Sequence, residues 1–169
     1  MSATANFLTP FTSALRVTMF SIMSLASLAG VSQTISDRMV DVGGRRLHLS
    51  EAGFGAATVV FESGFGEDLS TWDDVQPRIA QFAHTVTYDR AGLGKSDMLP
   101  LSPRARTVKD MTADLHSLLH AAKIVPPYLL VGHSLGGTIV QVFAHAYPSE
   151  VVGMVLVDPE DSRLVDALH

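Results

Sequence analysis

A ten-residue stretch in the second half of the chain, YLLVGHSLGG at residues 128–137, constrains the fold more than any other part of the sequence. An apolar run suited to a buried strand leads straight into Gly132-x-Ser134-x-Gly136, and a helical pattern follows. A sharp strand-to-helix turn holds a serine hydroxyl clear of its neighbours, and side chains at the flanking glycines would collide across it. The turn also leaves the N–H of Leu135 unpaired, so that it can point at a forming oxyanion. The alternative is a glycine-rich turn with an incidental serine.

Short β-rich runs alternate with helical patterns beyond Asp37, which is typical of crossover units on a largely parallel sheet. The expected strands cover residues 39–44, 46–53, 58–64, 84–92, 128–134 and 153–159. Gly43 and Gly44 can take the positive φ angles of a tight hairpin, so the first two strands should be antiparallel. The last strands are continuous apolar runs, as expected where helices cover both faces of a sheet. The sequence therefore predicts the α/β class, with a mostly parallel central sheet and flanking helices.

Three helices fit between these strands, and the clearest begins at Thr107. Asp110 stands three residues on in a capping arrangement, and Pro126 and Pro127 are expected to end this helix. The prolines in residues 98–106 indicate a surface loop before it.

The other two helices flank the fourth strand and the serine turn. One should run from near Trp72 toward Phe82, and it tolerates Pro77 only in its first turn, so its true start should lie later. The other follows Ser134 and ends before Pro148.

The first forty residues are expected to form a separate segment. Arg16 precedes residues 17–36, which carry no charged side chain and are mostly apolar. This stretch is typical of a secretory signal, or of a single membrane anchor of about 20 residues. Either would make the rest of the chain secreted, periplasmic or membrane-anchored, with membrane association through residues 14–36. The alternative is an amphipathic helix packed on the domain. We divide the chain at residues 1–36 and 37–169.

Composition excludes some classes of function. The chain has 47% hydrophobic and 17% charged residues, enough apolar material for one core, and its net charge is −5. Lysines and arginines are scattered, so no basic stripe is available to bind nucleic acid. There is no cysteine, which excludes disulfides, thiolate nucleophiles and zinc–thiolate sites.

Two further loops contain candidate site residues. After the third strand comes Glu62-Ser63-Gly64-Phe65-Gly66, a flexible loop in which the N–H of Phe65 could supply a second oxyanion donor. After the fourth strand comes the block YDRAGLGKSD at residues 88–97.

Together with the serine turn, these blocks resemble the α/β-hydrolase family, in particular its esterase and lipase-like members, over about residues 40–161. The resemblance implies that Ser134 is the nucleophile, that Leu135 and Phe65 provide the oxyanion amides, and that Gly64, Gly132 and Gly136 are motif positions. It also implies that Asp89 and Arg90 shape the pocket floor, against the alternative of a solvated charged loop. His133 is the variable position inside the turn and should point away from the nucleophile's partner.

The activity that this resemblance implies is hydrolysis of a small-molecule carboxylic ester through an acyl-enzyme on Ser134. No metal and no organic cofactor would be needed. Thioesters, lactones, amides and epoxides are alternative substrates, although epoxide hydrolysis normally calls for an aspartate where Ser134 stands.

In the α/β-hydrolase family the triad runs serine, acid, histidine along the chain. Asp158, 24 residues after Ser134, is the candidate acid, with a helix-cap or loop role before Pro159 as the alternative. Glu160 and Asp161 are weaker options.

No histidine fits the position of the base. His48, His84, His116, His120, His133 and His145 lie in or beside expected strands, helices and the serine turn, and they are expected to be surface or packing residues. His169, the last residue, comes too soon after the sixth strand. We therefore expect an N-terminal fragment, truncated after the sixth strand, with impaired activity and an uncovered strand edge. The alternative is a non-catalytic fragment or binding module that keeps the pocket.

Overall fold

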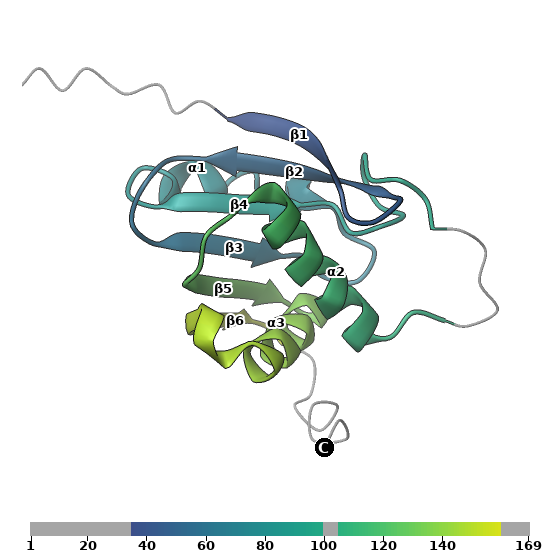
Figure 1. Ribbon diagram of the computed structural model, residues 1–169. Coiled ribbons are helices and arrows are strands. Elements are labelled where there is room, and N and C mark those ends of the chain that lie inside the picture. The colour runs from purple at the N-terminus through teal and green to yellow at the C-terminus, as the bar shows by residue number, and fades with distance from the viewer. Residues whose placement is uncertain (1–34, 100–104, 160–169) are drawn as a thin grey trace, which may run out of the picture. The chain divides into compact units, whose positions relative to one another are not determined.

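The computed structural model describes residues 35–99 and 105–159, and a six-stranded sheet runs through this part in the order β1-β2-β4-β3-β5-β6 (Figure 1). The strands are β1 (Ser36–Asp41), β2 (Arg46–Ala52), β3 (Thr58–Glu62), β4 (His84–Tyr88), β5 (Tyr128–His133) and β6 (Val151–Val157). β2 is antiparallel to β1 and to β4, whereas β3 is parallel to β4 and β5, and β5 is parallel to β6. The predicted α/β class and mostly parallel sheet are confirmed.

The predicted hairpin between β1 and β2 is present, and Asp41 closes it. Gly43 and Gly44 have φ angles of +95° and +91°, a region that side chains disfavour. Asp41 Oδ1 accepts hydrogen bonds from the N–H groups of Gly43 at 2.8 Å and Gly44 at 2.9 Å. These bonds lower the pKa of Asp41 because they stabilise its carboxylate.

Helix α2 (Val108–Ala122) begins where the sequence predicts. Thr107 and Asp110 form a reciprocal capping box: Thr107 Oγ1 accepts from the Asp110 N–H at 3.3 Å, and Asp110 Oδ2 accepts from the Thr107 N–H at 2.8 Å. The helix ends at Lys123, which has a φ of +61°, three residues before Pro126. The prediction that the prolines end it was therefore wrong, because a left-handed residue does so first.

We expect Thr107→Ala to lower the free energy of unfolding by about 1 kcal/mol, because the first turn of α2 loses the side-chain half of its cap. Ser117→Ala is the matched control, since it removes an exposed hydroxyl from the middle of the same helix. Urea denaturation of both variants checks this, and equal losses would contradict the capping role.

The region expected to form one helix from residue 72 to residue 82 instead forms two short ones, η1 (Leu69–Trp72) and α1 (Gln76–Ile79). Pro77 lies in the first turn of α1, as predicted. α3 (Leu135–Ala146) directly follows Ser134, and the short helix η2 (Pro148–Glu150) leads into β6.

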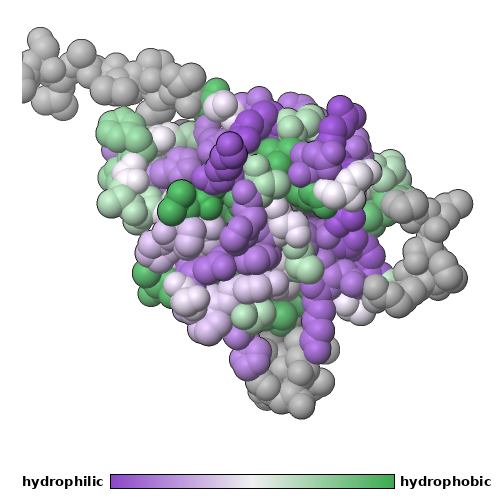
Figure 2. Space-filling model, viewed as in Figure 1, coloured by the Kyte–Doolittle hydropathy of each residue, from purple (hydrophilic) through white to green (hydrophobic). Residues whose placement is uncertain are grey.

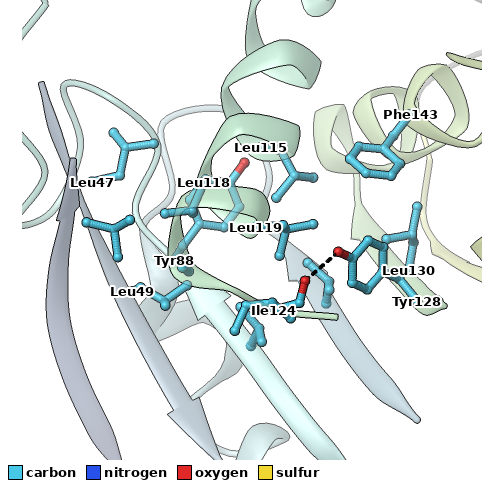
Figure 3. Packing of buried hydrophobic residues seen from close by; sticks show 14 of the residues in the cluster. Leu47, Leu49, Tyr88, Leu115, Leu118, Leu119, Ile124, Tyr128, Leu130 and Phe143 are labelled. Carbon is cyan, nitrogen blue, oxygen red and sulfur yellow. Dashed lines mark hydrogen bonds between the residues drawn. The ribbon is translucent and has the colours of Figure 1, made fainter. Parts of the chain in front are cut away.

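Helices cover the two faces of the sheet unequally. α2 and α3 lie on the face toward the viewer in Figure 1 and α1 lies on the other, and the surface over α2 and α3 is largely polar in Figure 2. Neighbouring strand residues point to opposite faces, so Val60 joins the cluster under α2 and α3, whereas Phe61 packs on Trp72 on the other face. Figure 3 shows the first cluster, which contains Leu47, Leu49, Tyr88, Leu115, Leu118, Leu119, Ile124, Tyr128, Leu130 and Phe143.

Strand β6 lies at the edge of the sheet and is only partly covered. Val152 is 65% exposed and Val155 is 47% exposed. The expectation that the last strands are buried on both faces holds for β5 but is wrong for β6, because in the described part of the chain β6 pairs with β5 alone. The expectation of an uncovered apolar edge is confirmed for these residues.

The N-terminal segment expected to be a signal or anchor lies outside the described residues, apart from Ile35 and Ser36, and Ser36 already belongs to β1. Within residues 35–99 and 105–159, no helix combines the length and the apolar character that crossing a membrane requires.

Candidate active site

Ser134 occupies the turn between β5 and α3 in a strained backbone conformation. Its φ is +49° and its ψ is −119°, values that residues with a side chain rarely adopt. The Ser134 N–H donates to the carbonyl of Val157 at 3.0 Å, and the Ser134 carbonyl accepts from Gly137 at 2.8 Å. The side chain is only partly buried, and within the described ranges its hydroxyl has no hydrogen-bond partner. The turn therefore presents a free hydroxyl.

Glycines on both sides of Ser134 allow the start of α3 to approach the end of β3. A Cβ at Gly132 would lie 2.5 Å from the carbonyl oxygen of Gly136, and a Cβ at Gly136 would lie 2.3 Å from that of Glu62. Any larger residue at either position would displace backbone. This close approach brings the loop after β3 next to the serine turn.

Two backbone amides lie at this junction, one on each segment. Leu135 is the first residue of α3, and in the described part of the chain no hydrogen bond occupies its N–H. Phe65 lies in the loop after β3 with its side chain 81% exposed, and its N–H is likewise unoccupied within the described residues. Leu135 and Phe65 also line one cavity.

Glu67 fastens the loop after β3 to the serine turn. Its Oε2 accepts from the Gly64 N–H at 2.8 Å and lies 3.0 Å from Nδ1 of His133. The hydrogen bond from His133 lowers the pKa of Glu67. A Cβ at Gly64 would lie 2.8 Å from Glu67 Oε2 and 2.9 Å from His133 Nδ1, so a larger residue here would push the Glu67 and His133 side chains aside. Sequence reasoning missed Glu67, since nothing in its spacing distinguishes it from a surface acid.

Arg90 holds the same loop from beneath the surface. Its Nη1 donates to Glu62 Oε1 at 2.5 Å and to the Ser63 carbonyl at 2.6 Å, and its Nη2 donates to the Gly64 carbonyl. Tyr88 also donates to Glu62, which is 1% exposed. Burial raises the pKa of Glu62, and the charge of Arg90 opposes this shift. The solvated-loop alternative for Arg90 is therefore wrong: its guanidinium is buried and fixes the backbone next to Phe65.

Asp89 is likewise buried, at 2% exposure, and ties three segments together. Its carboxylate accepts from the N–H groups of Leu69 at 2.9 Å and Lys95 at 2.8 Å, and it lies 2.9 Å from Nδ1 of His48. A Cβ at Gly94 would lie 2.2 Å from Asp89 Oδ2, which explains the glycine there. Asp89 lines a different, more polar cavity beside His48, so of the two residues expected at the pocket floor only Arg90 borders the cavity of Phe65 and Leu135.

The cavity beside Phe65 and Leu135 has a volume of about 280 Å³ and a largely apolar lining. Its walls include Ala91, Leu93, Leu99 and Met111. If the N–H groups of Phe65 and Leu135 bind the carbonyl oxygen of a ligand, an apolar part of that ligand would fit against these side chains. Apart from Arg90, local sequence patterns do not reveal these walls, because they come from the loop after β3, the block after β4, α2 and the start of α3.

Comparison with known proteins agrees with this geometry. The family model described as "Serine aminopeptidase, S33" matches residues 55–160, which include the loop after β3, the block after β4 and the serine turn. The chain belongs to the α/β-hydrolase family.

Individual relatives match this α/β-hydrolase chain over part of their own length. Protein YqjL of Bacillus subtilis is 41% identical over 107 residues, which are 63% of this chain and 41% of that protein. An AB hydrolase superfamily protein of Gibberella zeae is 30% identical, over 62% of this chain and 33% of its own. Epoxide hydrolase A of Mycobacterium thermoresistibile superposes with a TM-score of 0.64 at 31% identity, covering 73% of this chain and 39% of that one. The chain thus spans less than half the length of these α/β-hydrolase relatives.

Asp158, the candidate acid, directly follows β6 with a φ of +43° and an exposed side chain. The preceding residue, Val157, accepts the hydrogen bond from the Ser134 N–H, so the backbone of Asp158 lies near the serine turn. No hydrogen bond or ion pair occupies its carboxylate within the described residues. The weaker options, Glu160 and Asp161, lie outside the described residues.

The described histidines of this α/β-hydrolase chain lie away from Ser134 or pair with acids. His145 is near the far end of α3, roughly 15 Å along the helix from Ser134. The acid pairs are His48 with Asp89, His84 with Glu51, His116 and His120 with Glu150, and His133 with Glu67. His169 lies outside the described residues. The expectation that none of the described histidines is the base of Ser134 therefore agrees with their positions.

Proposed function

We propose that this chain is the nucleophile half of a serine hydrolase that acts on carboxylic esters. The observation that carries the proposal is the backbone of Ser134, strained at φ +49° with a hydroxyl that has no partner within the described residues. Strain of this kind costs about 1–3 kcal/mol and persists where the surroundings enforce it, typically at functional sites. The two amides and the apolar cavity beside the turn support the same reaction.

The chemistry follows from these positions. Ser134 Oγ attacks the ester carbonyl and loses its proton to a base, and the carbonyl oxygen takes the negative charge, which the N–H groups of Leu135 and Phe65 stabilise. Collapse of this intermediate expels the alcohol with a proton and leaves an acyl-enzyme, which water hydrolyses to the acid. In the whole protein, residues beyond those described would supply the base, and Asp158 is our candidate for the acid.

Two observations favour a small apolar ester as the substrate. A serine stands at the nucleophile position, whereas epoxide hydrolysis normally calls for an aspartate there, so the epoxide hydrolases among the structural relatives do not set the substrate class. Among the described residues, the charged side chains that line the cavity next to the amides are Arg90, Arg106 and Asp114, and its other walls are mainly apolar. The acyl group of such an ester would lie against them.

A fluorophosphonate probe tests the proposal, because it phosphonylates an activated serine. We expect mass spectrometry of the labelled protein to locate the label on Ser134. Ser63 is an internal control: it is 3% exposed, donates its hydroxyl proton to the Asp68 carbonyl, and should stay unlabelled. A folded protein without label on Ser134 would favour the non-catalytic binding module instead.

A further inference from the structure

A second cluster of polar side chains lies at the end of the sheet opposite to Ser134. His116 and His120 are four residues apart on α2, so their side chains share one face of the helix, and Glu150 ends η2 just before β6. Figure 1 shows β5 and β6 pointing the same way, so Ser134 follows their carboxyl end while Glu150 stands at their amino end. Seven residues of β6 separate the two ends, a distance of about 20 Å.

The three side chains point their nitrogen and oxygen atoms at one another. His116 Nε2 lies 3.1 Å from Glu150 Oε1, and His120 Nε2 lies 3.7 Å from the same oxygen. All three ligand atoms lie within 4.8 Å of one another. Zinc binds imidazole nitrogen and carboxylate oxygen at about 2.0–2.2 Å in tetrahedral geometry, which places neighbouring ligand atoms about 3.3–3.5 Å apart. The observed spacings bracket this value, so an ion could enter with small side-chain shifts.

The surroundings of His116 hold its ring in place, and those of Glu150 leave one carboxylate oxygen without a partner among the described residues. The His116 ring stacks on Tyr147 with a centroid distance of 3.7 Å and an interplanar angle of 5°, and it also contacts Phe143. Glu150 Oε2 is buried and has no hydrogen-bond partner among the described residues. A ligand that is already ordered loses little entropy on binding, and a buried carboxylate oxygen without a partner gains from a cation beside it.

We propose that His116, His120 and Glu150 bind one Zn²⁺ ion, with an open fourth position for water. Two imidazoles and a single carboxylate suit a divalent transition metal, whereas Mg²⁺ and Ca²⁺ require more oxygen ligands than this cluster offers. The ion would join α2 to the segment that leads into the edge strand β6. It stabilises the fold at the end remote from Ser134 and takes no part in the hydrolysis proposed above, which requires no metal.

Calorimetric titration of the full chain, without a histidine tag, with zinc chloride tests the proposal. We expect one ion to bind, and His120→Ala to weaken this affinity by at least about tenfold, since it removes one of three protein ligands. His120 is the variant of choice because its side chain is 59% exposed, so the fold should survive its loss. Magnesium chloride in place of zinc chloride should give no binding heat.

His84→Ala is the matched control. His84 pairs with Glu51 at 3.3 Å, and both side chains have the same exposure as those of His116 and Glu150, but among the described residues no third ligand completes a metal-binding group with them. We expect His84→Ala to retain zinc affinity, and zinc to raise the Tm of the unaltered chain and of His84→Ala by more than that of His120→Ala. Equal zinc affinity in the unaltered chain and in His120→Ala, or equal losses in the two variants, would overturn the proposal.

Discussion

Ser134→Gly is expected to abolish fluorophosphonate labelling and at the same time to raise the free energy of unfolding, because it relieves about 1–3 kcal/mol of backbone strain. The loss of labelling follows from the missing hydroxyl. The gain in stability follows from the φ of +49°, which glycine adopts without the steric penalty that a Cβ carries. Part of this gain is offset by the larger backbone entropy that glycine loses on folding, about 0.5–1 kcal/mol.

Ser134→Ala is the matched control, because it removes the hydroxyl and keeps the Cβ. It should abolish labelling and leave the stability close to that of the unaltered chain. Chemical denaturation of the unaltered chain, Ser134→Gly and Ser134→Ala measures the strain at this position, independently of the loss of labelling. If Ser134→Gly has no larger free energy of unfolding than Ser134→Ala, the turn stores no strain. The backbone conformation of Ser134 would then no longer support the proposed function.

Arg90→Met is expected to lower the free energy of unfolding by about 3–5 kcal/mol. The substitution leaves the buried carboxylate of Glu62 without its charged partner and frees the carbonyls of Ser63 and Gly64. The double variant Glu62→Met with Arg90→Met removes both charges and should lose less than Arg90→Met alone. Fluorophosphonate labelling should also fall in Arg90→Met where the protein is still folded, because the loop that carries Phe65 is no longer held.

The pH dependence of the Arg90→Met deficit provides a second measurement. Burial raises the pKa of Glu62 in the folded state, and without Arg90 this shift is larger. A carboxyl with a raised folded pKa favours folding below its unfolded pKa and loses that contribution as the pH rises through the folded pKa. The deficit should therefore be largest at neutral pH and shrink at mildly acidic pH. A deficit that does not change with pH would contradict a role for the buried charge.

Features that depend on short stretches of sequence were predicted well. The two adjacent glycines predicted the hairpin of β1 and β2, and Thr107 with Asp110 predicted the start of α2. The β-rich runs predicted all six strands, although β1 begins and ends three residues earlier than expected. Backbone geometry and hydrogen bonds within a few residues decide these elements. The position of Ser134 between β5 and α3 followed from the same local pattern.

Contacts between residues far apart in the chain were not predictable in this way. Glu67 meets His133 and Glu62 meets Arg90 across 66 and 28 residues, and no periodicity marks such partners. The prediction that β6 is buried was wrong for a related reason. An apolar run indicates a strand, but the place of that strand in the sheet decides whether it is covered. The split of the expected helix into η1 and α1 was missed for a local reason instead: Asp68 caps η1 by accepting from the Ser70 N–H at 2.9 Å.

The hydrogen bond from the Ser134 N–H to Val157 links the nucleophile position mechanically to the outermost strand of the sheet. In the described part of the chain β6 has a neighbour on one flank only, as β1 has at the other edge of the sheet, so the backbone groups on its free flank are unpaired. A segment or molecule that pairs with this border would stiffen it, and one that pulls on it would shift the main chain of Ser134 directly. The backbone position of Ser134 therefore depends on the edge strand β6 as well as on β5, which leads into the turn.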